Sequence, residues 1–212
     1  MEPRLILSAG IPRSGSTWLY NAARLLLSAC GHEGLEAAWI EDYDPESPAA
    51  LHLVKLHEPA PALLEKSRLV LTSRRDLRDI ACSVRRMNWA KSDEDLLAFL
   101  EGVVAQHRYW AAEAAHEMVY EAMVAGRLAE LARIAKALGL SPDQQALGEV
   151  AQHIDRLKHD PGSGDTYDKL SLLHHAHRGR GGVSAYPEEL SAALARRIED
   201  QFGDWLSAQG YL

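Results

Sequence analysis

The stretch SAGIPRSGSTWLY, residues 8–20, decides the fold of this chain. It overlaps the end of the apolar run RLILSAG, residues 4–10, which is typical of a buried strand. It leads into STWLYNAARLLLSAC, residues 16–30, an apolar helix pattern that Gly31 ends. A strand, a glycine-containing turn and a helix follow one another here, which is the order of elements in a nucleotide-binding loop.

The turn differs from the loop that holds a nucleoside triphosphate. Gly10 and Gly15 occupy the two glycine positions, but no lysine follows Gly15, and the basic residue is Arg13, two positions earlier. Backbone N–H groups at a helix N-terminus bind phosphate. Three hydroxyl side chains add donors: Ser14, Ser16 and Thr17. We therefore expect an anion at this loop, while a simple glycine turn remains the alternative.

The composition fits a single domain over residues 1–212 that buries its own core. The net charge of −7 gives no bulk attraction to nucleic acid or to anionic membranes, so any anion site must be local. No apolar stretch approaches the roughly 18 residues of a membrane span, and the first apolar run is too short for a signal peptide. Cys30 and Cys82 form no Cys-x-x-Cys pair, which favours a reducing compartment. We expect a cytoplasmic protein without nucleic-acid partners.

Strand and helix patterns alternate along the rest of the chain. Further strands are predicted at residues 50–59, 67–75 and 117–121. Helices are predicted at residues 76–87, 93–117, 126–140, 143–158 and 187–212, with a loop at 160–185. This alternation predicts an α/β fold, a three-layer sandwich with a central parallel sheet, a P-loop-type strand–loop–helix and a closing C-terminal helix.

Lys55 and His57 lie at the end of the second predicted strand, in VKLHEP. Side chains alternate along a strand, so both point to the same side. The carboxyl end of a parallel strand is where ligands bind in an open α/β sheet. A cation beside a neutral imidazole suits anion handling with proton transfer. A solvated lysine beside a hydrogen-bonded histidine is the alternative.

A second strand–turn–helix unit follows in LTSRRDLRDIACS, residues 71–83. Arg74 and Arg75 close the strand, and Ser83 lies two turns into the helix on a face that also carries Asp79. An arginine at the strand end and a serine on the helix would clasp a further phosphate. A basic surface cluster is the alternative.

Together these segments resemble the sulfotransferases that use 3′-phosphoadenosine 5′-phosphosulfate (PAPS). PRSGSTW, residues 12–18, is similar to the family's 5′-phosphosulfate loop, and VKLHEPAPALL, residues 54–64, to its Lys-x-His-x-Pro strand end. RDLRDIACS, residues 75–83, resembles its 3′-phosphate motif, and VYEAM, residues 119–123, its Tyr-Glu-Asp segment. HRGRGGVSAY, residues 177–186, looks like its glycine-rich closing loop. The motifs occur in family order over nearly the whole chain.

The resemblance implies catalytic roles for three residues. His57 would take the proton of the acceptor as general base, and Lys55 would stabilise the transferring sulfuryl oxygens. Arg13 stands where the family has a lysine and would neutralise the departing nucleotide. Since a guanidinium does not give up a proton, its role would be electrostatic only.

The resemblance also implies the residues that bind the nucleotide. Besides Arg13, the 5′-phosphate would be cradled by Ser14, Gly15, Ser16 and Thr17. The 3′-phosphate would be bound by Arg75 and Ser83, completed by Arg178 with Gly179 or by Arg180 with Gly181. The adenine would lie near Trp18 and Tyr120, although either aromatic ring would also serve as core. PAPS would be the sulfuryl donor, no metal would be needed, and the acceptor would be a small molecule or a carbohydrate.

Two other functions remain open. A P-loop kinase acting on a small molecule is disfavoured because no lysine follows Gly15 and no Walker B strand is evident. A non-catalytic nucleotide-binding module is disfavoured by Lys55 and His57. His174, His175 and His177 are expected to line the closing loop or to lie in solvent, rather than to bind a metal. His107, Tyr109 and Trp110 would either pack in the core or line an acceptor pocket.

Overall fold

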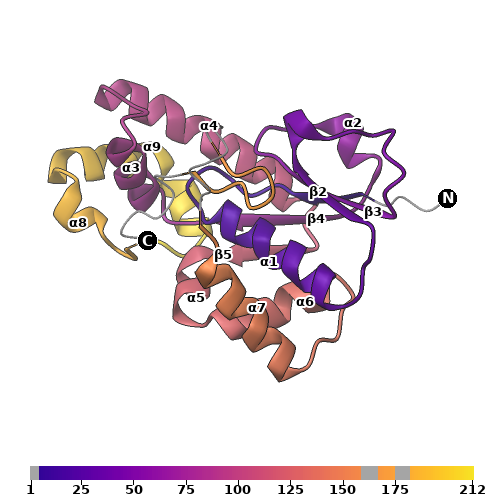
Figure 1. Cartoon of the computed structure of the whole chain (residues 1–212). Coiled ribbons are helices and arrows are strands. Elements are labelled where there is room, and N and C mark those ends of the chain that lie inside the picture. Colours follow the sequence, from indigo (N-terminus) through magenta and orange to yellow (C-terminus); the bar gives the residue numbers. More distant parts are fainter. Residues whose placement is uncertain (1–4, 159–166, 175–181) are drawn as a thin grey trace.

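The structure is a computed structural model that describes residues 5–158, 167–174 and 182–212. In this part of the chain, five parallel strands form one sheet in the order β2-β3-β1-β4-β5 (Figure 1). The strands are β1 (Leu5–Ser8), β2 (Leu35–Trp39), β3 (Leu51–Lys55), β4 (Ser67–Arg74) and β5 (His116–Val119). β1 is central because all four of its residues are buried and apolar or small, as a strand covered on both faces requires.

Helices cover both faces of the sheet, which confirms the predicted α/β architecture (Figure 1). One face carries α1 (Ser16–Ala29), α5 (Tyr120–Ala125), α6 (Arg127–Ala137) and α7 (Gln144–Arg156). The other carries α2 (Pro61–Leu64), α3 (Leu77–Arg86), α4 (Asp93–Ala111) and α9 (Ala192–Ala208), with α8 (Tyr186–Glu189) beside α3. Separate apolar clusters fill the two sides, one under α1, α6 and α7 and the others between α3, α4, α9 and the sheet.

Several predicted helix boundaries hold because the capping residues act as expected. The Asp76 carboxylate accepts the backbone N–H of Arg78 and begins α3, and Ser92 and Asp95 form a capping box at the start of α4. Gly31, with φ 80°, follows the end of α1 in the left-handed conformation that a glycine allows. These caps explain why helix starts could be located from sequence alone.

Other elements differ from the prediction. The strand predicted at 50–59 ends at Lys55, and the helix predicted at 93–117 ends at Ala111, because residues 116–119 pair with β4. The single helix predicted at 187–212 is two helices, since Leu190 and Ser191 adopt extended backbone between α8 and α9. β2, α2 and α5 were not predicted. Whether residues 1–212 fold as a single unit stays a prediction.

Candidate functional site

The loop between β1 and α1 is shaped by two residues with positive φ. Arg13 has φ 64° and Gly15 has φ 83°, and Gly15 stands at the N-cap of α1. An arginine in the left-handed region is uncommon and costs free energy that surrounding contacts must offset. The guanidinium of Arg75 contributes one such contact, donating from Nη1 to the Arg13 carbonyl at 3.4 Å.

Ser14 belongs to this loop, but its side chain is turned under the loop and is hydrogen-bonded there. Its hydroxyl donates to the Ile11 carbonyl at 2.7 Å and lies 2.6 Å from the Ser73 hydroxyl, and its backbone N–H also bonds to Ile11. The side chain is fully buried. The structure thus gives Ser14 a supporting position under the loop, where the sequence pattern had placed it among the phosphate-binding residues.

Gly10 is required by the close approach of β4 to the loop. A Cβ on Gly10 would lie 2.2 Å from the Ser73 hydroxyl oxygen and 2.8 Å from the Ser16 Cβ. Overpacking of this kind costs about 1–3 kcal/mol, so Gly10→Ala should lower the free energy of unfolding in urea by that amount. Gly148→Ala is the matched control, because a Cβ in the middle of α7 meets nothing within 4 Å and should stabilise by roughly 0.5–1 kcal/mol. Equal effects of the two substitutions would contradict the close-approach argument.

The first cavity, of about 620 Å³, opens above the loop and the N-terminus of α1. Its polar lining is Arg13, Gly15, Ser16, Thr17, Asn21, Arg75, Ser83, Arg86, Arg127 and Asp155. Its apolar and aromatic lining is Trp18, Met87, Tyr120, Met123, Val124, Ile154, Leu157 and Leu173. A cavity with a helix N-terminus, several arginines and aromatic rings suits an anionic ligand that carries a flat base.

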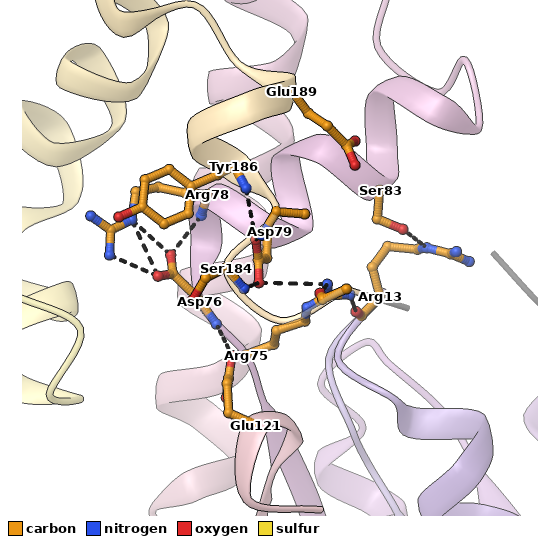
Figure 2. A network of polar contacts seen from close by, with 12 residues as sticks. Arg13, Arg75, Asp76, Arg78, Asp79, Ser83, Glu121, Ser184, Tyr186 and Glu189 are labelled. Carbon is orange, nitrogen blue, oxygen red and sulfur yellow. Dashed lines mark hydrogen bonds and ion pairs between the residues drawn. The ribbon is translucent and has the colours of Figure 1, made fainter. Parts of the chain in front are cut away.

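Arg13 reaches from the loop to α3 within this cavity. Its Nε donates to the Ser83 hydroxyl at 2.8 Å (Figure 2). Its guanidinium also lies 5.3 Å from the centre of the Trp89 ring. Burial, followed by the nearby charges of Arg75 and Arg86, lowers the pKa of Arg13. Cations that lower one another's pKa gain free energy when an anion enters between them, so this cluster favours anion binding.

Arg75 and Tyr120 form one stack beside the loop. The Arg75 guanidinium lies 4.2 Å from the centre of the Tyr120 ring, and a Cβ added to Gly15 would lie 2.9 Å from this ring. Tyr120 begins α5, where a strand had been predicted. Its ring therefore lies next to the loop between β1 and α1 as well as in the wall of the cavity.

A second cavity, of about 460 Å³, holds Lys55 and His57. Aromatic and apolar side chains make most of its wall: Trp39, Met87, Trp89, Phe99, Tyr167 and Leu172. Lys55 is the last residue of β3 and His57 lies two residues beyond it, so both face the same space, as the alternation of side chains had indicated.

The tautomer of His57 is set by its neighbours. Its Nδ1 lies 2.5 Å from the Gly10 carbonyl oxygen, and since a carbonyl only accepts, Nδ1 carries the proton. In the neutral ring, Nε2 then keeps its lone pair and can accept a proton. The indole of buried Trp110 donates to the His57 carbonyl at 2.8 Å and fixes the backbone of this residue.

Lys55 is 5% exposed, and its ammonium lies 4.7 Å from the centre of the Trp39 ring. Burial, with a further contribution from the charge of Arg13, lowers the pKa of Lys55 to about 7. Trp39 pairs with Lys55 across β2 and β3 and also meets the His57 ring edge-on at 5.2 Å. One tryptophan thus contacts both side chains that the sequence had suggested for catalysis.

The two cavities meet at the loop. Arg13, Ser16, Thr17 and Met87 line both of them. A ligand that fills the first cavity with its anionic end on the loop therefore presents that end to Lys55 and His57. This juxtaposition joins the three motifs that lie far apart in the sequence.

The remaining predicted residues divide into three groups. Arg178, Gly179, Arg180 and Gly181, with His175 and His177, lie outside the described residues. His174 lines the second cavity beside Tyr167. His107, Tyr109 and Trp110 line neither cavity; His107 is held between Glu117 and the Trp205 indole, which makes packing the right interpretation.

Sequence reasoning missed several lining residues. Trp39 was missed because the short strand LEAAW carries no strong alternation, whereas Trp89 and Phe99 come from the turn after α3 and from α4. Arg86 could have been found, because it follows Ser83 by three residues on the same helix and so shares its face.

No group of three potential metal-ligating side chains gathers among the residues that the structure describes. No helix in the same residues combines the length and the apolar character needed to cross a membrane.

A scan against protein-family models and a search of curated proteins found no match to this sequence. Solved structures match over 97% of the chain. A mouse sulfotransferase, SULT7A1, complexed with PAP matches with a TM-score of 0.70 at 14% identity over 84% of that chain. Retinol dehydratase in complex with androsterone and inactive cofactor PAP matches with a TM-score of 0.70 at 16% identity over 81% of its chain. Retinol dehydratase in a complex with retinol and PAP matches with a TM-score of 0.67 at 16% identity over 82% of its chain. These matches establish a shared fold.

Proposed function

We propose that this chain, which has the fold of sulfotransferases that bind PAP, transfers the sulfuryl group of PAPS to a hydroxyl group of a small-molecule acceptor. The observation that carries the proposal is the junction of the two cavities at the loop, with Arg13 common to both. The cationic lining of one cavity and the proposed general base of the other would then lie on opposite sides of a single reacting group.

The lining of the first cavity fits PAPS. Four arginines line it in a chain whose net charge is −7: Arg13, Arg75, Arg86 and Arg127. The Nε of Arg75, a residue that lines this cavity, is buried and has no hydrogen-bond partner among the described residues. When bound, PAPS supplies the sulfuryl group and a nucleotide leaving group. Ser16 and Thr17 at the start of α1 would hold its 5′ side, and Arg75 with Ser83 its 3′-phosphate.

In the proposed mechanism, His57 and Lys55 act on the acceptor side. His57 Nε2 takes the proton of the acceptor hydroxyl while the oxygen forms its bond to sulfur. Lys55 stabilises the charge on the sulfuryl oxygens, and Arg13 stabilises the charge that develops on the departing phosphate oxygen. The two cavities hold the partners in line, which removes much of the entropic cost of bringing them together.

The wall of the second cavity favours an acceptor with an apolar or aromatic body. Trp39, Trp89 and Phe99 provide flat faces, and the charged groups lie where the loop meets the cavity. Retinol and androsterone, the compounds bound to retinol dehydratase, are of this type. An amine acceptor is the alternative to a hydroxyl, and an aromatic wall also accommodates the apolar face of a sugar.

Calorimetric titration with PAP, beside ATP with magnesium, tests the proposal. We expect PAP to bind and ATP not to compete, because the loop lacks the lysine that contacts the β- and γ-phosphates of a triphosphate. Transfer of labelled sulfuryl from PAPS to a panel of phenols and alcohols would then identify the acceptor. Preference for ATP would favour the kinase, and binding of PAP without transfer to any acceptor would favour a non-catalytic module.

A further inference from the structure

Asp79 is a buried carboxylate that the proposed reaction does not use. It lies on α3, one turn after Arg75, and it is 1% exposed. Its two oxygens accept backbone N–H groups from a segment more than 100 residues later, at 2.8 Å from Ser184, 2.9 Å from Ala185 and 3.2 Å from Tyr186 (Figure 2). Hydrogen bonds to an ionised acceptor are about twice as strong as neutral ones, so these three hold the segment firmly on α3.

The same carboxylate also faces Arg75. Asp79 Oδ2 lies 3.7 Å from Arg75 Nη2, and both side chains are almost completely buried. Arg75 Nη2 in turn donates to the Gly182 carbonyl at 2.6 Å. Gly182 lies two residues before Ser184, so the position of its carbonyl depends on the bonds that Asp79 makes. Asp79 therefore acts on the Arg75 guanidinium twice, directly by charge and indirectly through Gly182.

These contacts fix the plane of the guanidinium. Nη1 donates to the Arg13 carbonyl, Nη2 to the Gly182 carbonyl, and the flat face lies on Tyr120. Nε has no partner among the described residues, although it is buried in a residue that lines the nucleotide cavity. A planar cation held by hydrogen bonds from Nη1 and Nη2, with its buried Nε donor unsatisfied, is preorganised for an anion.

We propose that Asp79 is a positioning residue for nucleotide selectivity: by fixing Arg75 and residues 182–186 together, it makes the site prefer an adenosine nucleotide that carries a 3′-phosphate. This inference rests on the proposed function, in which Arg75 binds the 3′-phosphate. Asp79 itself does not touch the ligand. Asp79 affects nucleotide binding by fixing the orientation of Arg75 and the position of the Gly182 carbonyl, to which Arg75 donates.

If Asp79 only stabilised the fold, its replacement would affect nucleotide binding differently. The three N–H groups belong to the residues that enter α8, so Asp79 also serves as a cap for this short helix. If capping were its only role, its loss would lower the melting temperature and weaken all nucleotides equally. A positioning role weakens only those ligands that contact Arg75 through a 3′-phosphate.

The test is Asp79→Asn, titrated calorimetrically with PAP and with AMP, which lacks the 3′-phosphate. Because the amide keeps the shape of the carboxylate but loses its charge and one acceptor, we expect PAP to bind about 10- to 100-fold more weakly. AMP affinity should stay unchanged. Asp76→Asn is the matched control on the same helix, since Asp76 pairs with Arg78 and Asn also serves as an N-cap. Its ratio of PAP to AMP affinity should equal that of the unsubstituted chain.

The outcomes separate this inference from the function on which it rests. An unsubstituted chain that binds PAP no better than AMP would overturn the proposed function. A chain that prefers PAP, with the same preference in Asp79→Asn, would overturn the role of Asp79 alone. If Asp79→Asn does not fold, Asp79→Glu decides, because it keeps the charge and displaces it: a reduced ratio of PAP to AMP affinity supports positioning, and an unchanged ratio contradicts it.

Discussion

Replacing His57 with alanine should lower kcat for sulfuryl transfer by about 10²–10⁴-fold, the usual contribution of a positioned general base. Its Nδ1 donates to the Gly10 carbonyl, so in the neutral ring Nε2 is the nitrogen that can accept a proton, and the residue lines the second cavity. His57 does not line the first cavity, where we propose that the nucleotide binds, so the Kd for PAP should not change. The measurement is steady-state turnover of PAPS at saturating acceptor, with calorimetry of PAP binding alongside.

The matched control for this substitution is His52→Ala. His52 belongs to the same strand, β3, and lines neither cavity. Turnover should be retained there. Added imidazole should restore part of the activity of His57→Ala, because the space left by the ring lies in an open cavity. Unchanged kcat in His57→Ala would remove His57 from the reaction and leave Lys55 as the group to examine.

Replacing Lys55 with methionine should abolish most turnover and at the same time stabilise the fold at neutral pH. Removing one group that stabilises developing charge costs about 10²–10³-fold in kcat. The gain in stability follows from burial, which lowers the pKa of Lys55 to about 7 from an ordinary value of 10.5. Between these two values the unfolded chain binds more protons than the folded chain.

The sign of the pH dependence follows from this difference. The destabilisation by the buried ammonium is fully present below about pH 7 and fades as pH rises toward 10.5. At 1.36 kcal/mol per tenfold change in proton affinity, it is on the order of a few kcal/mol. Lys55→Met should therefore raise the melting temperature by several degrees at pH 6, and by much less at pH 10.

Thermal unfolding at both pH values measures this difference. Lys66→Met provides the control, since Lys66 is exposed at the end of α2 and its loss should not give a pH-dependent gain. If Lys55→Met lowers the melting temperature relative to the unsubstituted chain, and by the same amount at pH 6 and pH 10, then the buried ammonium does not destabilise the fold. The expected combination, a more stable protein without activity, is typical of a functional group held in an unfavourable environment.

Much of the fold could be predicted because its signals are local. The apolar run of β1, the glycine turn and the pattern of α1 lie within one continuous stretch, and Asp76 and Ser92 mark helix starts by capping backbone N–H groups a few residues away. Elements without such signals were missed. β2 is short and half-buried, and its place at the sheet edge comes from pairing with β3.

The sequence by itself determined the α/β class, the strand–glycine turn–helix at the loop, and the order of the three motifs that carry Arg13, Lys55, His57 and Arg75. Each depends on residues close together in the chain, where periodicity and capping act. Only the tertiary structure decided which of them cooperate. Gly10 selects the tautomer of His57 from 47 residues away, and Trp39 covers Lys55 from a neighbouring strand. Asp79 holds a segment 105 residues later against Arg75. Contacts of this kind arise from packing between distant parts of the chain, and no local pattern encodes them.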